Sequence, residues 1–456
     1  MLILKFGGTS VKDDEAFARV LQIIQESSNS EKCFVVLSAS ATITDSLIML
    51  MHFAVHNDLE NGRTCFEKIS LHHLQLLYKL IPDDSPYFNE AETKIRILLD
   101  ELQEISKSVN FLKESTPRTL DKIMSYGELL STTLMYYYLL NNSLNAFFVD
   151  AREIIATDSS YNKAKVDFEK SKINVNEKIL PLFDEGMDIG ISQGFIGANN
   201  SKQTTTLGRG GSDYTASLFG KFLNATEIQI WTDVDGILSA DPRLIKEVST
   251  IPVMEFNEMR SLAYFGAKVV SPDALIPAIE ANIPIKVLNT FSETLRKGTY
   301  ILPKLNRQKS ELHSVMRMDV YKINFSISKL DNFLEDSLKI ITKIQQQNGK
   351  IYSISILPDK LTVWIDKATF NKSHFSTTFS NYSPEICDDL TLFGLVGINL
   401  NNFDSHHFIT RFHKYKFEYI EIGVSPNEIL ISIKSEAARE FYREVNQFIL
   451  ANLNVS

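Results

Sequence analysis

Cysteine is scarce in this 456-residue sequence, and the histidines lack the spacing of a metal site. Cys33, Cys65 and Cys387 lie far apart with no CxxC pair, which excludes a zinc site built on paired cysteines and fits a reducing compartment. The histidine pairs have no third ligand nearby, so we interpret them as structural and predict no protein metal site. Those pairs are His52 and His56, His72 and His73, and His406 and His407.

Long apolar runs and an excess of positive charge are also missing. No stretch approaches the ~18 apolar residues that a membrane helix needs, and the opening MLILKFGG is too short for a signal peptide. The 47 basic and 56 acidic residues give a net charge of −9, which argues against nucleic-acid and membrane-surface partners. We therefore expect a soluble, cytoplasmic protein that binds neither nucleic acid nor membrane.

What is present is the composition of an ordinary globular protein, with 44% hydrophobic and 23% charged residues. Short apolar runs such as MLILKF and CFVVL flank the helical pattern DDEAFARVLQIIQES, which predicts a βαβ unit and a parallel sheet. Similar runs return as NAFFV, MDIGIS, TEIQIW and IPIKVLN. This alternation predicts a three-layer α/β domain over residues 1–300, with a helical insert at about 45–115.

The pattern of expected strands and helices changes at the polar, basic segment LPKLNRQKSE. We place a linker at 301–311 and expect two similar units after it, at 312–385 and 386–456. Each reads as a strand, a helix and two strands, and the second ends in a further helix. Units this small bury their sheets poorly alone, so we expect the two to pair side by side.

The stretch TTTLGRGGSDYTAS at 204–217 concentrates three glycines between an expected strand and an expected helix. Glycine lets backbone N–H groups approach a ligand, and a helix N-terminus favours a phosphate or a carboxylate. Arg209 can bind a carboxylate through two parallel hydrogen bonds, and Asp213 can steady a cationic partner or help to place a metal. The alternative is a plain glycine-rich turn with a surface arginine and a capping aspartate.

KFGGTS at 5–10 is a second candidate anion site, because a lysine at a strand end precedes two glycines and two hydroxyls. It matches neither a Walker A loop nor a GxGxxG fingerprint, which disfavours those nucleotide folds. Lys5 is a mobile point charge that suits a phosphoryl group in transfer. The alternative is that Lys5 is a lone surface lysine with no functional role.

Together these stretches and four further motifs resemble the aspartate kinases of the amino-acid kinase superfamily. The match keeps the family's order and covers essentially the whole chain, a kinase domain followed by two α+β ACT (βαββαβ) domains. The helical insert resembles that of the lysine-sensitive and the bifunctional enzymes; no dehydrogenase domain follows, so we expect the monofunctional form. The motifs are KFGGTSV at 5–11, SYGELLS at 125–131, TTTLGRGGSDYTA at 204–216, WTDVDGI at 231–237, DPR at 241–243 and FGAKV at 265–269.

The resemblance implies that ATP, with Mg²⁺ held mainly by phosphate oxygens, phosphorylates the side chain of L-aspartate. The product, 4-phospho-L-aspartate, opens lysine, threonine and methionine (diaminopimelate) biosynthesis. The resemblance also implies a homodimer through the ACT domains and a possible amino-acid effector. Two alternatives stay open, which are a kinase for another small carboxylate and a catalytically silent ACT-type sensor.

Carried over residue by residue, the resemblance assigns catalytic roles to Lys5, Arg209 and Asp213. Arg209 would hold the substrate α-carboxylate, Glu128 its ammonium group and Thr44 a further polar contact, while Asp213 would bind the substrate side and orient Lys5. The residues implied at the nucleotide are Lys5, Phe6, Gly7, Gly8, Thr232, Asp233, Leu238, Arg243 and Lys268.

Simpler interpretations exist for several of these residues. Glu128 is alternatively an exposed helix carboxylate, and Thr44 a residue of a helix N-cap. WTDVDGI and ADPR are alternatively turns, and Lys268 a solvated lysine before a helix.

The sequence also departs from the family. Thr42 lies in SASATITD where relatives carry a glycine nearby, which would stiffen that loop. In the first ACT unit, Asn332-Phe333-Leu334 and Ile356-Leu357-Pro358-Asp359 replace the residues of lysine-sensitive relatives. Pro358 has no backbone N–H to offer an effector, so another amino acid or none is expected to bind there.

Overall fold

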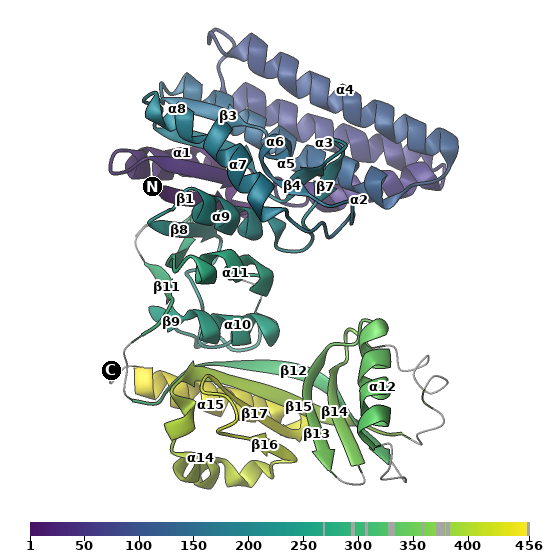
Figure 1. The fold of residues 1–456 in the computed structure, drawn as a ribbon, viewed down its shortest axis with the longest axis vertical. Coiled ribbons are helices and arrows are strands. Elements are labelled where there is room, and N and C mark those ends of the chain that lie inside the picture. The colour runs from purple at the N-terminus through teal and green to yellow at the C-terminus, as the bar shows by residue number, and fades with distance from the viewer. Residues whose placement is uncertain are drawn as a thin grey trace. The chain divides into compact units, whose positions relative to one another are not determined.

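A computed structural model of the chain describes residues 1–267, 270–292, 297–305, 309–326, 333–357, 360–370, 379 and 384–453. The chain divides into two compact units (Figure 1). The first comprises 1–237, 252–256 and 269–304, and the second comprises 238–251, 257–268 and 305–456. No helix of the described ranges combines the length and apolar character needed to cross a bilayer.

The first unit is built on an eight-stranded sheet of order β3-β5-β2-β1-β8-β10-β11-β9. All neighbouring pairs are parallel except β10 with β11, as the short apolar runs predict. The strands are β1 (Leu2–Phe6), β2 (Cys33–Leu37), β3 (Ala146–Val149), β5 (Ile189–Gln193), β8 (Glu227–Thr232), β9 (Val253–Glu255), β10 (Ile285–Asn289) and β11 (Gly298–Leu302).

Helices cover both faces of this sheet, so the expected three-layer fold is confirmed. Alternate residues of the central strands point to opposite faces. Leu4 and Phe6 join one core with α1 (Asp14–Ser28) and α5 (Pro117–Asn141). On the other face Phe34 packs 4.4 Å, between ring centroids, from Phe219 of α9 (Gly211–Phe222). Helix α11 (Pro272–Glu280) packs against α9.

The helical insert expected at about 45–115 consists of α2 (Ile43–Val55), α3 (Leu59–Leu80) and α4 (Phe88–Leu112). These helices and α5 contact one another and lie alongside in Figure 1. Asp58 caps α3 by accepting the Asn61 N–H, and Pro117 occupies the first turn of α5. Their inward faces extend the same hydrophobic core through residues such as Leu76 and Leu102.

A smaller three-stranded sheet of order β4-β6-β7 leads into the glycine-rich turn before α9. It consists of β4 (Ala156–Thr157), β6 (Ile196–Asn199) and β7 (Thr204–Thr206). Helices α6 (Ala151–Ile154) and α7 (Phe168–Lys178) contact this sheet, and α8 (Leu180–Asp184) packs against α7.

The second unit contains one six-stranded antiparallel sheet of order β13-β14-β12-β15-β17-β16. The two long strands β12 and β15 pair at its centre, so the repeats lie side by side as expected. The elements run β12 (Glu311–Ser326), α12 (Phe333–Gln346), β13 (Ile351–Leu357), β14 (Lys360–Asp366), then β15 (Glu385–Ile398), α14 (Ser405–Phe412), β16 (Tyr419–Glu421), β17 (Glu428–Lys434) and α15 (Ala438–Leu453).

This second unit also includes segments that precede β12 in the chain. Residues 238–251 and most of α10 (Phe256–Tyr264) belong to it. Ser239 donates to Asn446 at 2.8 Å, and the Asp241 N–H donates to the Tyr442 hydroxyl at 2.8 Å. Of the ACT stretches that depart from the family, Asn332, Pro358 and Asp359 lie outside the described residues.

Candidate active site

Two glycine-containing loops that are about 200 residues apart in the sequence line one cavity of about 600 Å³. Lys5 at the end of β1 and Gly8 just after it come from the first segment, and Gly208 to Asp213, in the turn and first residues of α9, come from the second. The remaining wall is formed by the segment after β2, by α5 and by isolated residues of other loops. Its members include Ser38, Ala39, Thr44, Met124, Glu128, Asn162 and Thr206.

The topology explains why these loops meet. β1 and β2 are parallel neighbours, so the chain leaves both strands at the same edge of the sheet. The Ser38 N–H donates to the Phe6 carbonyl at 3.1 Å, and the Ala41 N–H donates to the Gly8 carbonyl at 3.0 Å. Helix α9 packs on β1 and carries the second loop to the same edge.

Lys5 and Asp213 form an ion pair inside this cavity. The Lys5 Nζ lies 2.6 Å from the Asp213 Oδ1, and each side chain is only 11% exposed. The contact is therefore a close electrostatic pair. Asp213 lies in the first turn of α9, where a carboxylate also complements the helix dipole. The aspartate therefore holds the lysine ammonium against the cavity wall.

Glu128 is a buried carboxylate that faces the cavity from α5. Its side chain accepts the Ala39 N–H at 3.2 Å through Oε1, while Oε2 has no hydrogen-bond partner within the described structure. Burial raises the pKa of Glu128 to about 8, although nearby Lys5 opposes the shift. With 3% exposure, the alternative of an exposed helix carboxylate is wrong.

Glycine at position 127 allows this approach of α5 to the loop after β2. A Cβ at Gly127 would lie 2.6 Å from the Ala39 Cβ, closer than two carbons can pack. The helix backbone therefore lies directly against the loop whose N–H binds Glu128.

The raised pKa of Glu128 predicts a pH-dependent gain in stability for Glu128→Gln. Between the pKa of about 4.5 in the unfolded chain and about 8 in the folded protein, the folded state retains a proton that the unfolded state loses. Wild-type stability therefore falls across this window, whereas the amide does not titrate. We expect the advantage of E128Q in urea unfolding to grow by on the order of 3 kcal/mol from about pH 5 to pH 8.

Glu114→Gln, at an exposed position just after α4, is the matched control and should show no such trend. Parallel stability curves for E128Q and the wild-type protein would remove the argument for a neutral buried carboxyl group.

Arg209 extends from the turn before α9 with its side chain exposed. Among the described residues no carboxylate pairs with its guanidinium group. Gly208 and Gly210 on either side have φ of +80° and +74°, which side chains adopt at a cost. A Cβ at Gly210 would also lie 2.3 Å from the Ser271 Cβ. The turn thus displays an unpaired arginine at the cavity.

Thr44 also lines the cavity, but it is not the helix cap. Helix α2 begins at Ile43, so Thr44 lies inside the first turn and Thr42 is the N-cap residue. The Thr42 side chain makes no capping hydrogen bond. Its backbone is left-handed, with φ of 69°, which is an outlier for a β-branched residue.

We expect Thr42→Gly to stabilise the protein by about 1 kcal/mol, because glycine adopts this backbone conformation without strain. The measurement is the urea midpoint of the variant against wild type. Thr93→Gly, in the interior of α4, is the control and should destabilise by a few tenths of a kcal/mol instead. A loss of stability in Thr42→Gly would mean that position 42 is not strained.

Other residues expected at the nucleotide lie outside the lining of this cavity. Phe6 is wholly buried and stacks on Trp231, and the Gly7 N–H donates to the Trp231 carbonyl. Thr232 donates to Asp233 at the end of β8. Leu238 and Arg243 belong to the second unit, where Arg243 forms a two-pronged ion pair with Asp241. Lys268 lies outside the described residues.

Asp121 is a functional candidate that the sequence analysis missed. It is fully buried and accepts the N–H groups of Asn162 and Thr206 at 2.9–3.0 Å and the Thr206 hydroxyl at 2.8 Å. Burial raises its pKa, and these hydrogen bonds oppose the rise. Asn162 and Thr206 both line the cavity, so Asp121 positions its wall. The available signal was its position two turns before Glu128 on the same face of α5.

No group of three or more potential metal-ligating side chains occurs in the part of the chain that the structure describes. His73 is buried with its Nδ1 on the Ile69 carbonyl, and His52 stacks on His56 at 4.1 Å between ring centroids.

Known proteins resemble this chain in both sequence and fold. Residues 1–289 match the amino acid kinase family. Over 288 residues the chain is 36% identical to the lysine-sensitive aspartokinase 3 of Escherichia coli; this stretch is 63% of the chain and spans 61% of that relative. The structure of E. coli aspartokinase III in complex with aspartate and ADP superposes with a TM-score of 0.81 at 27% identity, covering 99% of each chain. The structure of that enzyme with lysine and aspartate superposes at 0.80 and 27%, covering 98% of this chain and 99% of that one.

Proposed function

The chain belongs to the amino acid kinase family, and from this we propose that it is an aspartate kinase. It transfers the γ-phosphoryl group of ATP to the side-chain carboxylate of L-aspartate, giving 4-phospho-L-aspartate and ADP. The observation that carries the proposal is one cavity that holds the Lys5–Asp213 ion pair together with a guanidinium group and a buried carboxylate oxygen that have no partner among the described residues.

Recognition of the amino acid follows from opposite charges at two places in the cavity. The Arg209 guanidinium group binds the α-carboxylate through two parallel hydrogen bonds. The unpartnered Oε2 of Glu128 accepts from the ammonium group. Because a bound cation favours the ionised carboxylate, substrate binding releases the proton that Glu128 holds below its pKa of about 8. Thr44 adds a hydroxyl contact.

Phosphoryl transfer needs positioning and charge stabilisation more than a protein nucleophile. Lys5 neutralises charge that develops on the transferred group, and Asp213 holds Lys5 in place. The backbone of Phe6, Gly7 and Gly8 and the loop of Thr232 and Asp233 bind the nucleotide. Mg²⁺ supplies further charge neutralisation when it is bound with ATP, held mainly by phosphate oxygens. The roles expected of Leu238, Arg243 and Lys268 rest on the family resemblance.

We also propose the domain limits and the biological setting. Residues 1–300 form the catalytic domain and 301–311 the linker, and the ACT units at 312–385 and 386–456 mediate a cytoplasmic homodimer. The reaction opens lysine, threonine and methionine biosynthesis. Support for an amino-acid effector comes from the relative solved with lysine and aspartate.

One assay separates this function from its alternatives. The purified protein is incubated with ATP, Mg²⁺ and aspartate, and acyl phosphate is trapped with hydroxylamine. Hydroxamate with aspartate is the expected result. A signal with glutamate but not with aspartate would assign a different carboxylate substrate. Absence of a signal with every acid would favour a catalytically silent amino-acid sensor.

A further inference from the structure

A second cavity in the first unit, of about 810 Å³, is lined mainly by charged and amide side chains. It lies among the start of α5, the helices α6 and α7, and the small sheet β4-β6-β7. Two of the lining side chains are acidic, Asp150 and Glu153. Six are cationic, namely Arg118, Lys122, Arg152, Lys170, Lys178 and Lys202.

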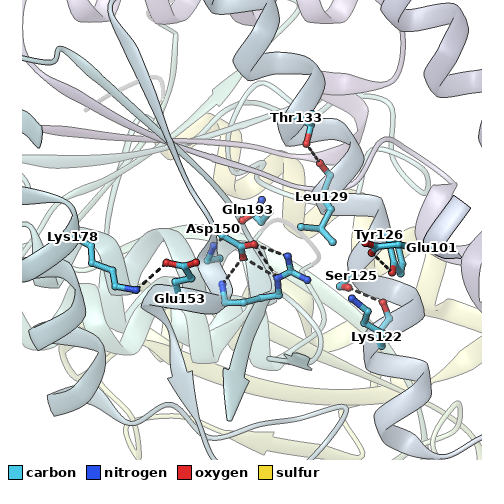
Figure 2. Close-up of polar contacts among 12 residues, drawn as sticks. Glu101, Lys122, Ser125, Tyr126, Leu129, Thr133, Asp150, Glu153, Lys178 and Gln193 are labelled. Carbon is cyan, nitrogen blue, oxygen red and sulfur yellow. Dashed lines mark hydrogen bonds and ion pairs between the residues drawn. The ribbon is translucent and has the colours of Figure 1, made fainter. Parts of the chain in front are cut away.

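Only two of the six cations are neutralised by the acids of the same cavity. Figure 2 shows Asp150, Glu153, Lys122 and Lys178 around this region. Arg152 forms a forked pair with Asp150 at 2.6–3.1 Å, and Lys178 lies 2.9 Å from Glu153. The other four have no carboxylate partner within the described ranges, and Lys170 donates to the Asn200 amide oxygen. In a chain of net charge −9, four cations that form no ion pair among the described residues gather around one cavity and make it an anion-attracting site.

Lys122 shows that this charge is partly desolvated. Its ammonium group lies 5.0 Å from the Tyr126 ring centroid on α5. Burial is the main cause that lowers the pKa of Lys122, and the Arg152 guanidinium group adds to it, whereas Glu101 and Asp150 oppose the shift. An anion in the cavity would relieve this repulsion between cations. A bound anion is therefore attracted more strongly to this partly desolvated ammonium group than it would be to a fully exposed lysine.

The geometry points to a binding site for a small phosphate compound that carries at least two negative charges. Lysine ammonium groups act as point charges for phosphate oxygens, and the exposed Arg118 guanidinium group offers a fork. The volume lies within the range of small-molecule sites. Amide side chains of Asn174, Asn199 and Gln203 along the wall provide polar contacts for the rest of an organic phosphate.

This site is distinct from the candidate active site. Among the described residues none lines both cavities. Strand β7 and the start of α5 separate them, because Thr204 and Lys122 line the cationic cavity whereas Thr206 and Glu128 line the other. The proposal therefore stands apart from the proposed kinase activity, and its readout is binding.

Titration calorimetry of the full chain with inorganic pyrophosphate tests the site. The double variant Arg118→Ala/Lys202→Ala removes two exposed cations of the cavity, and Lys68→Ala/Lys94→Ala removes two exposed lysines of α3 and α4 as a matched control. We expect the cavity variant to bind at least tenfold more weakly than wild type. The control should bind within twofold of wild type, and Lys5→Ala, which removes a charge from the proposed nucleotide site, should keep the binding component that the cavity variant loses.

Arg118→Glu is a second variant for the case in which the double variant fails to fold. It removes a cation of the cavity, and an acidic residue in the first turn of α5 favours the helix. It should also weaken binding at least tenfold while its thermal unfolding matches wild type. The proposal is overturned if wild type binds no pyrophosphate, if only Lys5→Ala loses binding, or if the cavity variants bind like the control.

Discussion

Replacing Lys5 with alanine should lower kcat for phosphoryl transfer about 10²- to 10³-fold while the KM for aspartate changes by less than about threefold. Loss of one preorganised charge at the transferring group typically costs this much, about 3–4 kcal/mol of transition-state stabilisation. The KM changes little because no hydrogen bond or ion pair joins Lys5 to Arg209 or Glu128 within the described structure, and its ion-pair partner there is Asp213. The measurement is steady-state kinetics at saturating ATP, with thermal unfolding recorded because Asp213 loses its partner.

Lys12→Ala is the matched control for this change. Lys12 follows the same loop, but its side chain is half exposed and its nearest carboxylate, Asp13, is 3.7 Å away. Its kcat should stay within about twofold of wild type. A Lys5→Ala enzyme that keeps its kcat would end the transition-state role of this lysine. A large rise in the aspartate KM instead would place it at the amino acid.

Replacing Arg209 should have the second large effect, on binding of the amino acid. We expect Arg209→Lys to raise the KM for aspartate at least tenfold and Arg209→Ala about a hundredfold, with the KM for ATP nearly unchanged. Hydrogen bonds to a charged group contribute about 1.5–3 kcal/mol, and an ammonium group cannot reproduce the two-pronged contact. The side chain has no carboxylate partner within the described structure, so its removal breaks no ion pair seen there.

Arg63→Lys on α3 serves as the control, since this exposed arginine pairs with Glu67 one helical turn away. Its kinetic constants should match wild type. An unchanged aspartate KM in both Arg209 variants would remove Arg209 from the substrate site, and an equal rise in the KM for ATP would move it to the nucleotide.

Much of the fold was predictable because local patterns and global packing agree. The runs MLILKF and CFVVL became the neighbouring parallel strands β1 and β2, and the two C-terminal repeats share a sheet. The segment 238–251 was not predictable in this way. It precedes β9 in the sequence yet bonds to α15, about 200 residues later, through contacts that no local pattern encodes.

The residues of the candidate site also differ in how well the sequence predicts them. Lys5 and Arg209 could be predicted from the sequence because glycines mark the turns beside them. Glu128 was ambiguous, since α5 is buried over most of its length and its sequence shows no polar face from which to judge exposure. Asp121 was missed because a carboxylate near a helix start normally serves that helix, whereas this one binds Thr206, 85 residues away.

The central pairing of β12 with β15 has a consequence for anyone who shortens the chain. Removing the last repeat would take β15 away from β12 and leave β12 as an edge strand with a row of unpaired backbone N–H and C=O groups. Such a bare edge recruits strands from other molecules, and the apolar side chains of β12 that α15 of the same repeat covers would become exposed and favour this association. The two C-terminal repeats are therefore retained or removed together, and a truncation between them invites aggregation.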